Sequence, residues 1–335
     1  MDDKRYRWLL GAVFVFLVGA GFGVSRFWLS HQPQKNDKAK PRGPISRSIP
    51  LKSSGFPDPS PSDNTRSKPV PDGTVFDGAD HPYGRPAKGV LRWENNRAFH
   101  EFCSKHHISL RMAAFQTTLP DPLPGEEFNV ALAADLLAGT VVEPGRVFSM
   151  NGTIGPYTKD RGFQEGPAYF GTQVFKTIGG GVCKIATTLY NVTTLANLEI
   201  IERRPHGMPV PYVPPGQDAT VSDGAKDFKF RNNTGQPLFI WADTHENTLF
   251  MAIYGRTKPP KVEWRHQILR RQKNRIIHRV NRELPPGTQR VVIPGADGLT
   301  VKSWLIITYP EGRVNRRDLG IDTYQPLPEV RESGR

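Results

Sequence analysis

Residues 178–191 read Ile-Gly-Gly-Gly-Val-Cys-Lys-Ile-Ala-Thr-Thr-Leu-Tyr-Asn, so that three glycines lead almost directly into Cys183. Downstream, Ile185, Leu189, Val192 and Ala196 recur at the spacing of one buried face of an amphipathic helix. The pattern predicts a helix whose first turn contains Cys183. Unpaired N–H groups and the positive end of the helix dipole favour a thiolate there, and the thiolate is the nucleophilic form of cysteine.

The glycines before the cysteine suit a substrate site. They let the backbone approach a ligand closely and can turn N–H groups toward a developing oxyanion. We therefore predict Cys183 as a nucleophile, with Gly180 and Gly181 beside the substrate. The alternative is a small buried core cysteine after a tight turn. Three consecutive glycines weigh against that alternative, because a simple turn does not need their cost in backbone entropy.

A cysteine nucleophile needs a base, and His206 is the only histidine between Cys183 and Thr244. A Cys–His pair activates the thiol, and a carboxylate can orient the imidazole. Asp218, in the loop 214–218, is the predicted third group. As alternatives, His206 packs its loop and Asp218 ends a turn. No metal site or cofactor is predicted, because neither a paired cysteine nor a His-x-x-x-His spacing supports zinc.

Three further residues are candidate substrate contacts. Arg203 can hold a peptide carboxylate through its forked donors, and a solvated charge at a helix C-terminus is the alternative. Asn151 lies in the stretch 150–156, which we predict to be a loop that lines a cleft or a structural turn. Thr187 follows Cys183 within the predicted helix.

The N-terminal residues predict an exported protein. Residues 8–24 are apolar or glycine, follow a basic flank, and reach the short end of a membrane span of roughly 17–25 residues. The basic flank should stay inside, which places the rest of the chain outside the cytoplasm. We favour a signal anchor in the cell membrane, with a cleaved signal peptide as the alternative. Export argues against nucleic acid as a partner, and the net charge of +13 then points to anionic wall polymers.

Composition divides the chain into four parts. Residues 1–31 hold the cytoplasmic tip and the anchor, and residues 32–88, rich in Pro and Ser, are predicted to be a disordered linker. Residues 89–255 form the core domain, and residues 256–335 a small all-β module with Pro-Gly and Asp-Gly turns. Because helices precede strands in the core, the predicted fold class is α+β, with a mixed helix and antiparallel sheet core.

Within the core, several elements are predicted individually. They are a helix over 98–106, a strand over 108–118, a helix capped by Asn129 and ended by Gly139, two short strands in 141–149, and strands in 227–254 whose first connection is a hairpin turn at 232–235. Two cysteines in an exported protein invite a disulfide. Pairing of Cys103 with Cys183 would remove the nucleophile, and we favour free thiols.

A series of ordered motifs resembles the VanW family. They are Glu143-Pro-Gly-Arg-Val-Phe-Ser-Met-Asn151, the Gly-Pro and Arg-Gly-Phe that follow, Gly-Gly-Gly-Val-Cys183, Thr187-Thr-Leu-Tyr-Asn191, Glu199-Ile-Ile-Glu-Arg-Arg-Pro-His206 and Tyr212-Val-Pro-Pro-Gly-Gln-Asp218-Ala-Thr-Val221. The resemblance covers roughly residues 110–255. Family members are bacterial, exported and often membrane-anchored, and the family is named for glycopeptide-resistance clusters. For some members an L,D-transpeptidase activity on peptidoglycan stem peptides, with the family cysteine as nucleophile, has been proposed.

The resemblance therefore implies a cysteine acyltransferase that makes 3-3 cross-links. The family usually has Gln after the cysteine, where this chain has Lys184. A cation at this position could lower the pKa of the thiol further or alter substrate contacts.

The C-terminal residues resemble a G5 domain, a small extended β module of cell-surface proteins. That resemblance implies wall attachment, and the basic residues between 265 and 282 fit anionic wall polymers, with a solvated strand face as the alternative. Two functions thus remain open. One is the transpeptidase, and the other is a non-catalytic protein that binds peptidoglycan peptide or glycan.

Overall fold

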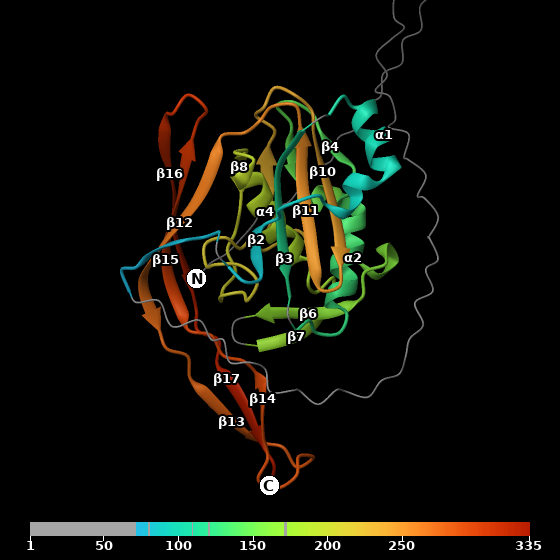
Figure 1. The fold of residues 1–335 in the computed structure, drawn as a ribbon. Coiled ribbons are helices and arrows are strands. Elements are labelled where there is room, and N and C mark those ends of the chain that lie inside the picture. Colours follow the sequence, from blue (N-terminus) through green and yellow to red (C-terminus); the bar gives the residue numbers. More distant parts are fainter. Residues whose placement is uncertain (1–71, 80, 109, 120, 171–172) are drawn as a thin grey trace, which may run out of the picture. The chain divides into compact units, whose positions relative to one another are not determined.

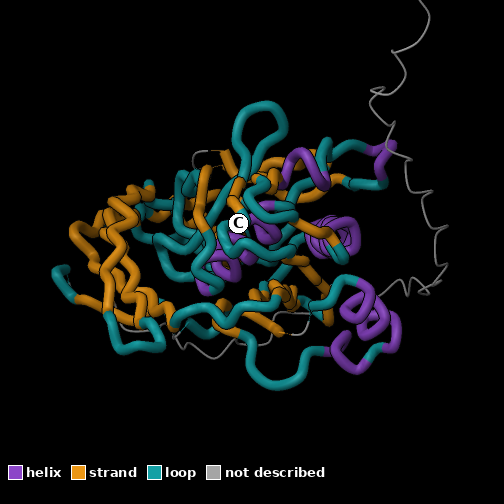
Figure 2. The backbone as a smooth tube through the Cα atoms, turned by 90° about the horizontal axis from the view of Figure 1, so that it is seen from above, coloured by secondary structure: helices purple, strands orange, loops and turns teal. Residues whose placement is uncertain are grey.

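The computed structural model describes residues 72–335, apart from residues 80, 109, 120, 171 and 172. The predicted membrane anchor and most of the predicted linker lie outside the described residues. Among the residues that are described, no helix is long and apolar enough to cross a membrane. Strands and loops make up most of this part of the chain, with few helices (Figure 2).

Helices occur only in the first half of the described chain, and the later half consists of strands and their connections (Figure 1). The helices are α1 (Arg97–Lys105), α2 (Glu126–Leu137), α3 (Met150–Ile154) and α4 (Cys183–Leu195), with 3-10 turns η1 (Arg92–Asn95) and η2 (Lys159–Arg161). The strands before residue 256 are β1 (Val75–Asp77), β2 (Gly84–Pro86), β3 (Leu110–Thr118), β4 (Thr140–Val142), β5 (Val147–Ser149), β6 (Glu165–Phe170), β7 (Gln173–Ile178), β8 (Glu199–Glu202), β9 (Lys229–Arg231), β10 (Leu238–His245) and β11 (Thr248–Gly255). The later strands are β12 (Lys261–Gln272), β13 (Ile276–Val280), β14 (Gln289–Ile293), β15 (Gly298–Thr308), β16 (Val314–Tyr324) and β17 (Glu329–Ser333).

A five-stranded antiparallel sheet, in the order β2-β3-β11-β10-β4, frames the core. Successive side chains of a strand point to opposite faces. Met251 and Ile253 of β11 accordingly lie in the main hydrophobic core, whereas Ala252 and Tyr254 lie in a second cluster with Phe99 of α1. Helix α4 packs on β3 and β11, and α2 packs on β10. The sheet thus carries α1 on one face and the helix that begins at Cys183 on the other.

The strands β12, β15 and β16, with the short β1 at the edge, form a four-stranded antiparallel sheet (Figure 1). Trp264 of β12 and Leu305 of β15 are buried in the same hydrophobic core as Ile185 and Leu189 of α4. Strands after residue 256 therefore help to enclose α4. The other three strands after residue 256 form a three-stranded sheet, β13-β17-β14, in which β13 and β17 run parallel. Among the earlier strands, β5-β9-β8 form another three-stranded sheet, and β6 pairs with β7.

The structure confirms a mixed fold with antiparallel sheets, and several individual predictions with it. The helix expected over 98–106 is α1, and the strand expected over 108–118 is β3. The predicted cap at Asn129 is wrong. The cap lies four residues earlier, at Gly125, whose φ of +85° and close approach to the Glu165 carbonyl require a glycine.

Three other predictions differ from the structure. Residues 150–154 are helical, because Ser149 caps α3 by accepting a hydrogen bond from the Gly152 N–H. The hairpin predicted at 232–235 is wrong, since β9 pairs with β5 and β8 while β10 pairs with β4 and β11. Residues 75–77 and 84–86, predicted as linker, form the edge strands β1 and β2.

Candidate active site

Cys183 is the first residue of α4 and follows a turn made by residues 179–182. Gly180 packs so closely on Gly166 of β6 that an added Cβ would collide with the Gly166 backbone. The buried Asn129 side chain of α2 donates to the carbonyl oxygens of Gly180, at 2.8 Å, and of Gln164, at 2.9 Å. The turn before Cys183 is therefore fixed from two sides.

Residues 217–221 run along one polar stripe of α4. The stripe consists of Cys183, Thr187 and Asn191, which lie four residues apart and therefore share a helix face. Asn191 Nδ2 donates to the Gln217 carbonyl at 2.7 Å. The Thr187 hydroxyl donates to the Ala219 carbonyl and accepts from the Ala219 N–H, both at 3.0 Å. These contacts hold the segment that carries Asp218 beside the cysteine.

Cys183, His206 and Asp218 lie together in the structure. His206 Nδ1 is 2.7 Å from Asp218 Oδ2, and the His206 backbone N–H donates to the same oxygen at 2.7 Å. The Cys183 thiol interacts with the His206 side chain, and this interaction shifts the pKa of both groups. The thiol also lies 3.3 Å from the Thr220 hydroxyl and 3.5 Å from the Val221 carbonyl oxygen. The side chains thus form a chain of thiol, imidazole and carboxylate, the order in which a base and its orienting group activate a nucleophile.

The electrostatics of the three groups favour a charged pair. Burial raises the pKa of the Cys183 thiol, but the hydrogen bond and the charge of His206 outweigh burial and leave the pKa below its usual value. Burial lowers the pKa of His206, but Asp218 and Cys183 outweigh it and raise the pKa to about 9. Both shifts act toward a thiolate beside an imidazolium. Asp218 supports that imidazolium, since burial is outweighed by His206 and Arg203 and its pKa falls to about 2.

Arg203, predicted to hold a peptide carboxylate, instead supports Asp218. Its guanidinium donates to Asp218 Oδ1 at 3.1 Å and to the Asp218 carbonyl at 2.7 Å. A third donor reaches Asp322 of β16 at 2.6 Å. The side chain is only 11% exposed, so it is neither a solvated charge nor free for a ligand. Charge-assisted hydrogen bonds of this kind stabilise the Asp218 carboxylate and also fix its orientation.

The other predicted substrate contacts are also engaged within the protein. Thr187 is fully buried against the 217–221 segment. Asn151 donates to the Lys226 carbonyl at 2.9 Å and accepts from the Tyr157 hydroxyl at 2.8 Å. The Gly180 N–H donates to the Thr177 carbonyl at 3.1 Å. Within the described residues, no acceptor is found for the N–H groups of Gly181 and Cys183, which leaves these two as candidate oxyanion donors.

Lys184 points away from the thiol. Its ammonium group is 1% exposed and lies 2.7 Å from Glu127 Oε1 and 2.9 Å from the Asn247 carbonyl oxygen. Lys184 therefore neutralises Glu127 of α2 and has no contact with the sulfur. Cys103 and Cys183 are both free cysteines, and they pack against different hydrophobic clusters.

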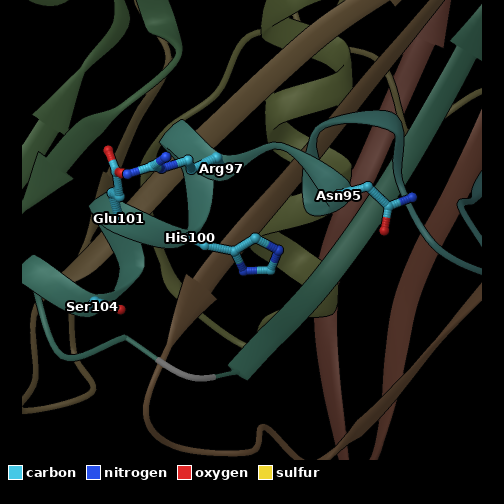
Figure 3. Close-up of a pocket in the computed structure, with 5 residues that line it drawn as sticks. All are labelled: Asn95, Arg97, His100, Glu101 and Ser104. Carbon is cyan, nitrogen blue, oxygen red and sulfur yellow. The ribbon is translucent and has the colours of Figure 1, made fainter.

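A hollow on the surface lies elsewhere, over η1 and α1. Its lining residues are Asn95, Arg97, His100, Glu101 and Ser104, and Figure 3 shows that they come from these two neighbouring elements. Arg97 and Glu101 form an ion pair at 2.7 Å, and both side chains are largely exposed. None of the predicted site residues lines this hollow. In the part of the chain that the structure describes, no three His, Cys, Asp or Glu side chains gather to hold a metal ion.

Residues 125–254 match the family model described as "VanW like protein". Residues 125–254, the VanW-like domain, are thus similar to this family. The domain contains Cys183, His206 and Asp218, and it lies within the segment 110–255 whose motifs carry the family resemblance. The resemblance is therefore confirmed for the segment that holds the three side chains.

Two curated proteins are similar to part of this chain. "Uncharacterized protein YoaR" of Bacillus subtilis (strain 168) is 34% identical over 149 residues, which are 44% of this chain and 49% of that protein. "Vancomycin B-type resistance protein VanW" of Enterococcus faecalis (strain ATCC 700802 / V583) is 30% identical over 137 residues, 39% of this chain and 50% of that protein. The chain spans about half the length of these relatives.

A solved structure described as "IgA1 Protease G5 domain structure" is 25% identical and covers 23% of this chain and 92% of that chain, with a TM-score of 0.15. The TM-score is too low to define a common arrangement in space.

The sequence alone did not indicate the residues that support Cys183, His206 and Asp218. Asn129 was interpreted as a helix cap, although its amide fixes the turn before Cys183. The stripe of Thr187 and Asn191 carried a usable signal, because polar residues recur every four positions after the cysteine. Tyr324 and Asp322 of β16, which contact Asp218 and Arg203, carried no such signal, since they lie more than a hundred residues from their partners.

Proposed function

We propose that Cys183, His206 and Asp218 are the catalytic residues of a cysteine acyltransferase that acts on peptidoglycan stem peptides. The observation that carries the proposal is the 2.7 Å contact of His206 Nδ1 with the buried Asp218 carboxylate, together with the interaction of the same imidazole with the Cys183 thiol. A structural cysteine would not require an adjacent imidazole whose pKa is raised by a buried carboxylate.

The chemistry needs no group beyond these side chains and the two peptides. The Cys183 thiolate attacks the carbonyl carbon of a donor stem peptide, a thioester forms, and the departing amine takes a proton from the His206 imidazolium. The amine of an acceptor peptide then attacks the thioester, gives its proton to His206, and releases the thiolate. In both steps the negative oxygen of the tetrahedral intermediate is met by the N–H groups of Cys183 and Gly181.

The substrate class rests on the family and on the charge of the chain. One relative is named as a vancomycin resistance protein, and the family resemblance implies peptidoglycan stem peptides as substrates. Residues 256–335 contain 17 Lys or Arg and 8 Asp or Glu, and so contribute +9 of the net +13. A basic C-terminal part would hold the enzyme to anionic wall polymers. We also propose that a domain boundary lies at residue 255 and that residues 256–335 form a G5-like module that attaches to the wall. A single N-terminal anchor would hold these domains on the outer side of the cell membrane.

The test is muropeptide mass spectrometry after incubation of the full chain, in mild detergent, with purified sacculi. The parent is expected to increase 3-3 cross-links, and Cys183→Ser is expected to lose that increase by several orders of magnitude. A serine hydroxyl is similar in size to the thiol but scarcely ionised near neutral pH. Cys103→Ser is the matched control, because it removes the other thiol, and it is expected to behave as the parent.

Equal cross-linking by the parent and Cys183→Ser would contradict the proposal. So would a parent that binds sacculi without changing their cross-links. That second outcome would favour the alternative function, a non-catalytic protein that binds peptidoglycan peptide or glycan. The specific observation behind the alternative is the basic C-terminal part, which supports binding whether or not the thiol reacts.

A further inference from the structure

We propose that Tyr324 and Asp322 of β16 are positioning residues of the Cys183 site, so that the working site extends beyond the VanW-like domain into the C-terminal sheet. The inference rests on the proposed function, because it concerns how Asp218 orients His206. It assigns to strands after residue 256 a role in thiol activation, in addition to any role in binding the wall.

The contacts of Asp218 divide between its two carboxylate oxygens. Oδ2 faces His206 and accepts from both its ring nitrogen and its backbone N–H. Oδ1 accepts from the Tyr324 hydroxyl at 2.5 Å and from the Arg203 guanidinium at 3.1 Å. Tyr324 and Arg203 thus occupy one oxygen and leave the other aimed at the imidazole. Rotation of the carboxylate would break these bonds, so Tyr324 opposes that rotation directly.

Asp322 acts one step further away. Its Oδ2 accepts from Arg203 at 2.6 Å, and the other donors of the same guanidinium bind Asp218. The guanidinium also lies over the ring of Tyr190 of α4, at 5.2 Å from the ring centre. Arg203 is therefore held between α4, β16 and Asp218. Because its planar guanidinium binds Asp322 and Asp218 at the same time, the position of β16 fixes the position of the Asp218 carboxylate.

The loop that carries Asp218 is itself seated on the C-terminal sheet. The Gly216 N–H donates to the Tyr324 hydroxyl at 2.8 Å, and Gln217 Nε2 lies 3.0 Å from Nε2 of His266 on β12. Gly216 has a φ of +96°, and an added Cβ there would collide with the Ser303 hydroxyl of β15. Three consecutive loop residues, 216–218, thus contact three strands of one sheet. Tyr324 is 2% exposed and joins two of these contacts.

The position of the sheet outside the VanW-like domain makes the inference testable. The family model ends at residue 254, whereas Asp322 and Tyr324 lie about 70 residues beyond it. If the VanW-like domain alone positioned Asp218, loss of the Tyr324 hydroxyl would leave the pKa of the Cys183 thiol unchanged. If β16 positions Asp218, the effect must reach Cys183 through His206.

The experiment measures the pH dependence of Cys183 alkylation by iodoacetamide in the full chain, purified in mild detergent. Peptide mass spectrometry separates Cys183 from Cys103. Tyr324→Phe keeps the buried ring and removes only the hydroxyl. We expect the apparent pKa of Cys183 to rise by about 1 unit, because a lost hydrogen bond to a charged group is worth this much and the loosened carboxylate supports the imidazolium less well. Tyr309→Phe, in the connection between β15 and β16 and stacked against Arg313, is the matched control and should not move the pKa.

A second variant guards against poor folding of the first. Arg203→Lys keeps the charge beside Asp218 and removes the fork that joins Asp218 to Asp322, and it should move the pKa of Cys183 in the same direction. Arg317→Lys, on β16 but bonded to Asn197, is its control. Thermal melting of each variant establishes that the folded protein is compared.

The outcomes separate three roles for Tyr324. An upward shift in the pKa of Cys183 supports positioning. An unchanged pKa with a lower melting temperature would overturn it in favour of packing alone. A downward shift would also overturn it, because it would mean that the hydroxyl mainly withdraws charge from Asp218. Alkylation needs no peptide substrate, so the result stands whether or not the protein cross-links sacculi.

Discussion

Replacing His206 by Gln tests whether the imidazole activates Cys183. The pKa of His206 is raised from 6.5 to about 9, which corresponds to roughly 3 kcal/mol of preferential stabilisation of the imidazolium. Asp218 and Cys183 share this stabilisation. The interaction between the two groups is reciprocal, so the imidazolium stabilises the thiolate by the same free energy by which the thiolate stabilises the imidazolium. The share that comes from Cys183 therefore also lowers the pKa of the thiol, and each pKa unit is worth about 1.4 kcal/mol.

His206→Gln removes that share and leaves burial, which raises the pKa of the thiol. We therefore expect the pKa of Cys183 to move from below its ordinary value of 9.0 in the parent to above that value in the variant. Glutamine keeps a polar side chain of similar reach but carries no charge at any pH. At pH 7 the alkylation rate of Cys183 should fall at least tenfold, since the thiolate fraction falls by that factor for each unit.

The assay follows alkylation of the Cys183 peptide from pH 5 to pH 10.5 in the full chain. His245→Gln is the matched control, because His245 is exposed at the end of β10. Cys103 in the same samples provides an internal reference, since burial raises the pKa of that thiol. If Cys183 titrates alike in the parent and in His206→Gln, or titrates at or above 9.0 in the parent, the imidazole does not activate it.

Three further variants test the surroundings of the thiol. Asp218→Asn should destabilise the fold by about 2 kcal/mol at pH 7, because the pKa of Asp218 is lowered from 3.8 to about 2 in the folded protein. This stability is present above about pH 4 and is lost as the pH falls through about 2. Urea unfolding should therefore show that the difference between parent and variant vanishes near pH 2. Gly180→Ala should cost about 1–3 kcal/mol in thermal or urea unfolding, because its Cβ would collide with the Gly166 backbone. Lys184→Gln should also lower stability, by about 1.5–3 kcal/mol, because it breaks the ion pair with Glu127. The pKa of Cys183 should stay unchanged in Lys184→Gln, and a shifted thiol would contradict the direction in which Lys184 points.

The local part of the site could be predicted from the sequence. Apolar residues at helical spacing placed Cys183 at the start of α4, and the structure has that helix at 183–195. His206 followed from the shortage of histidines after the cysteine, and the structure brings its ring to Asp218. These predictions succeeded because each depended on residues close together in the chain or on a residue type with few candidates.

The support of the site could not be predicted, because it depends on contacts between distant segments. Arg203 reads as a solvated charge or a ligand contact in sequence, and only the placement of Asp322 on β16 makes it a buried clamp. Asn129 resembles a cap because asparagine is common at helix starts, but Gly125 begins the helix and frees the Asn129 amide for the glycine turn. Tertiary contacts thus give Arg203 and Asn129 supporting roles at the site that their local sequence does not indicate.

The cost of burying Asp218 is itself an argument for function. The carboxylate is fully buried, and isolated burial of such a charge would cost several kcal/mol. Four donors from His206, Arg203 and Tyr324 compensate for that cost. An apolar side chain could fill the same volume without any of these partners, and such replacements are often neutral or stabilising. A fold that needed only a loop at 214–218 would therefore not require the network. The network does hold a negative charge beside the imidazole that interacts with Cys183, and a carboxylate in this place orients the base that activates a thiol.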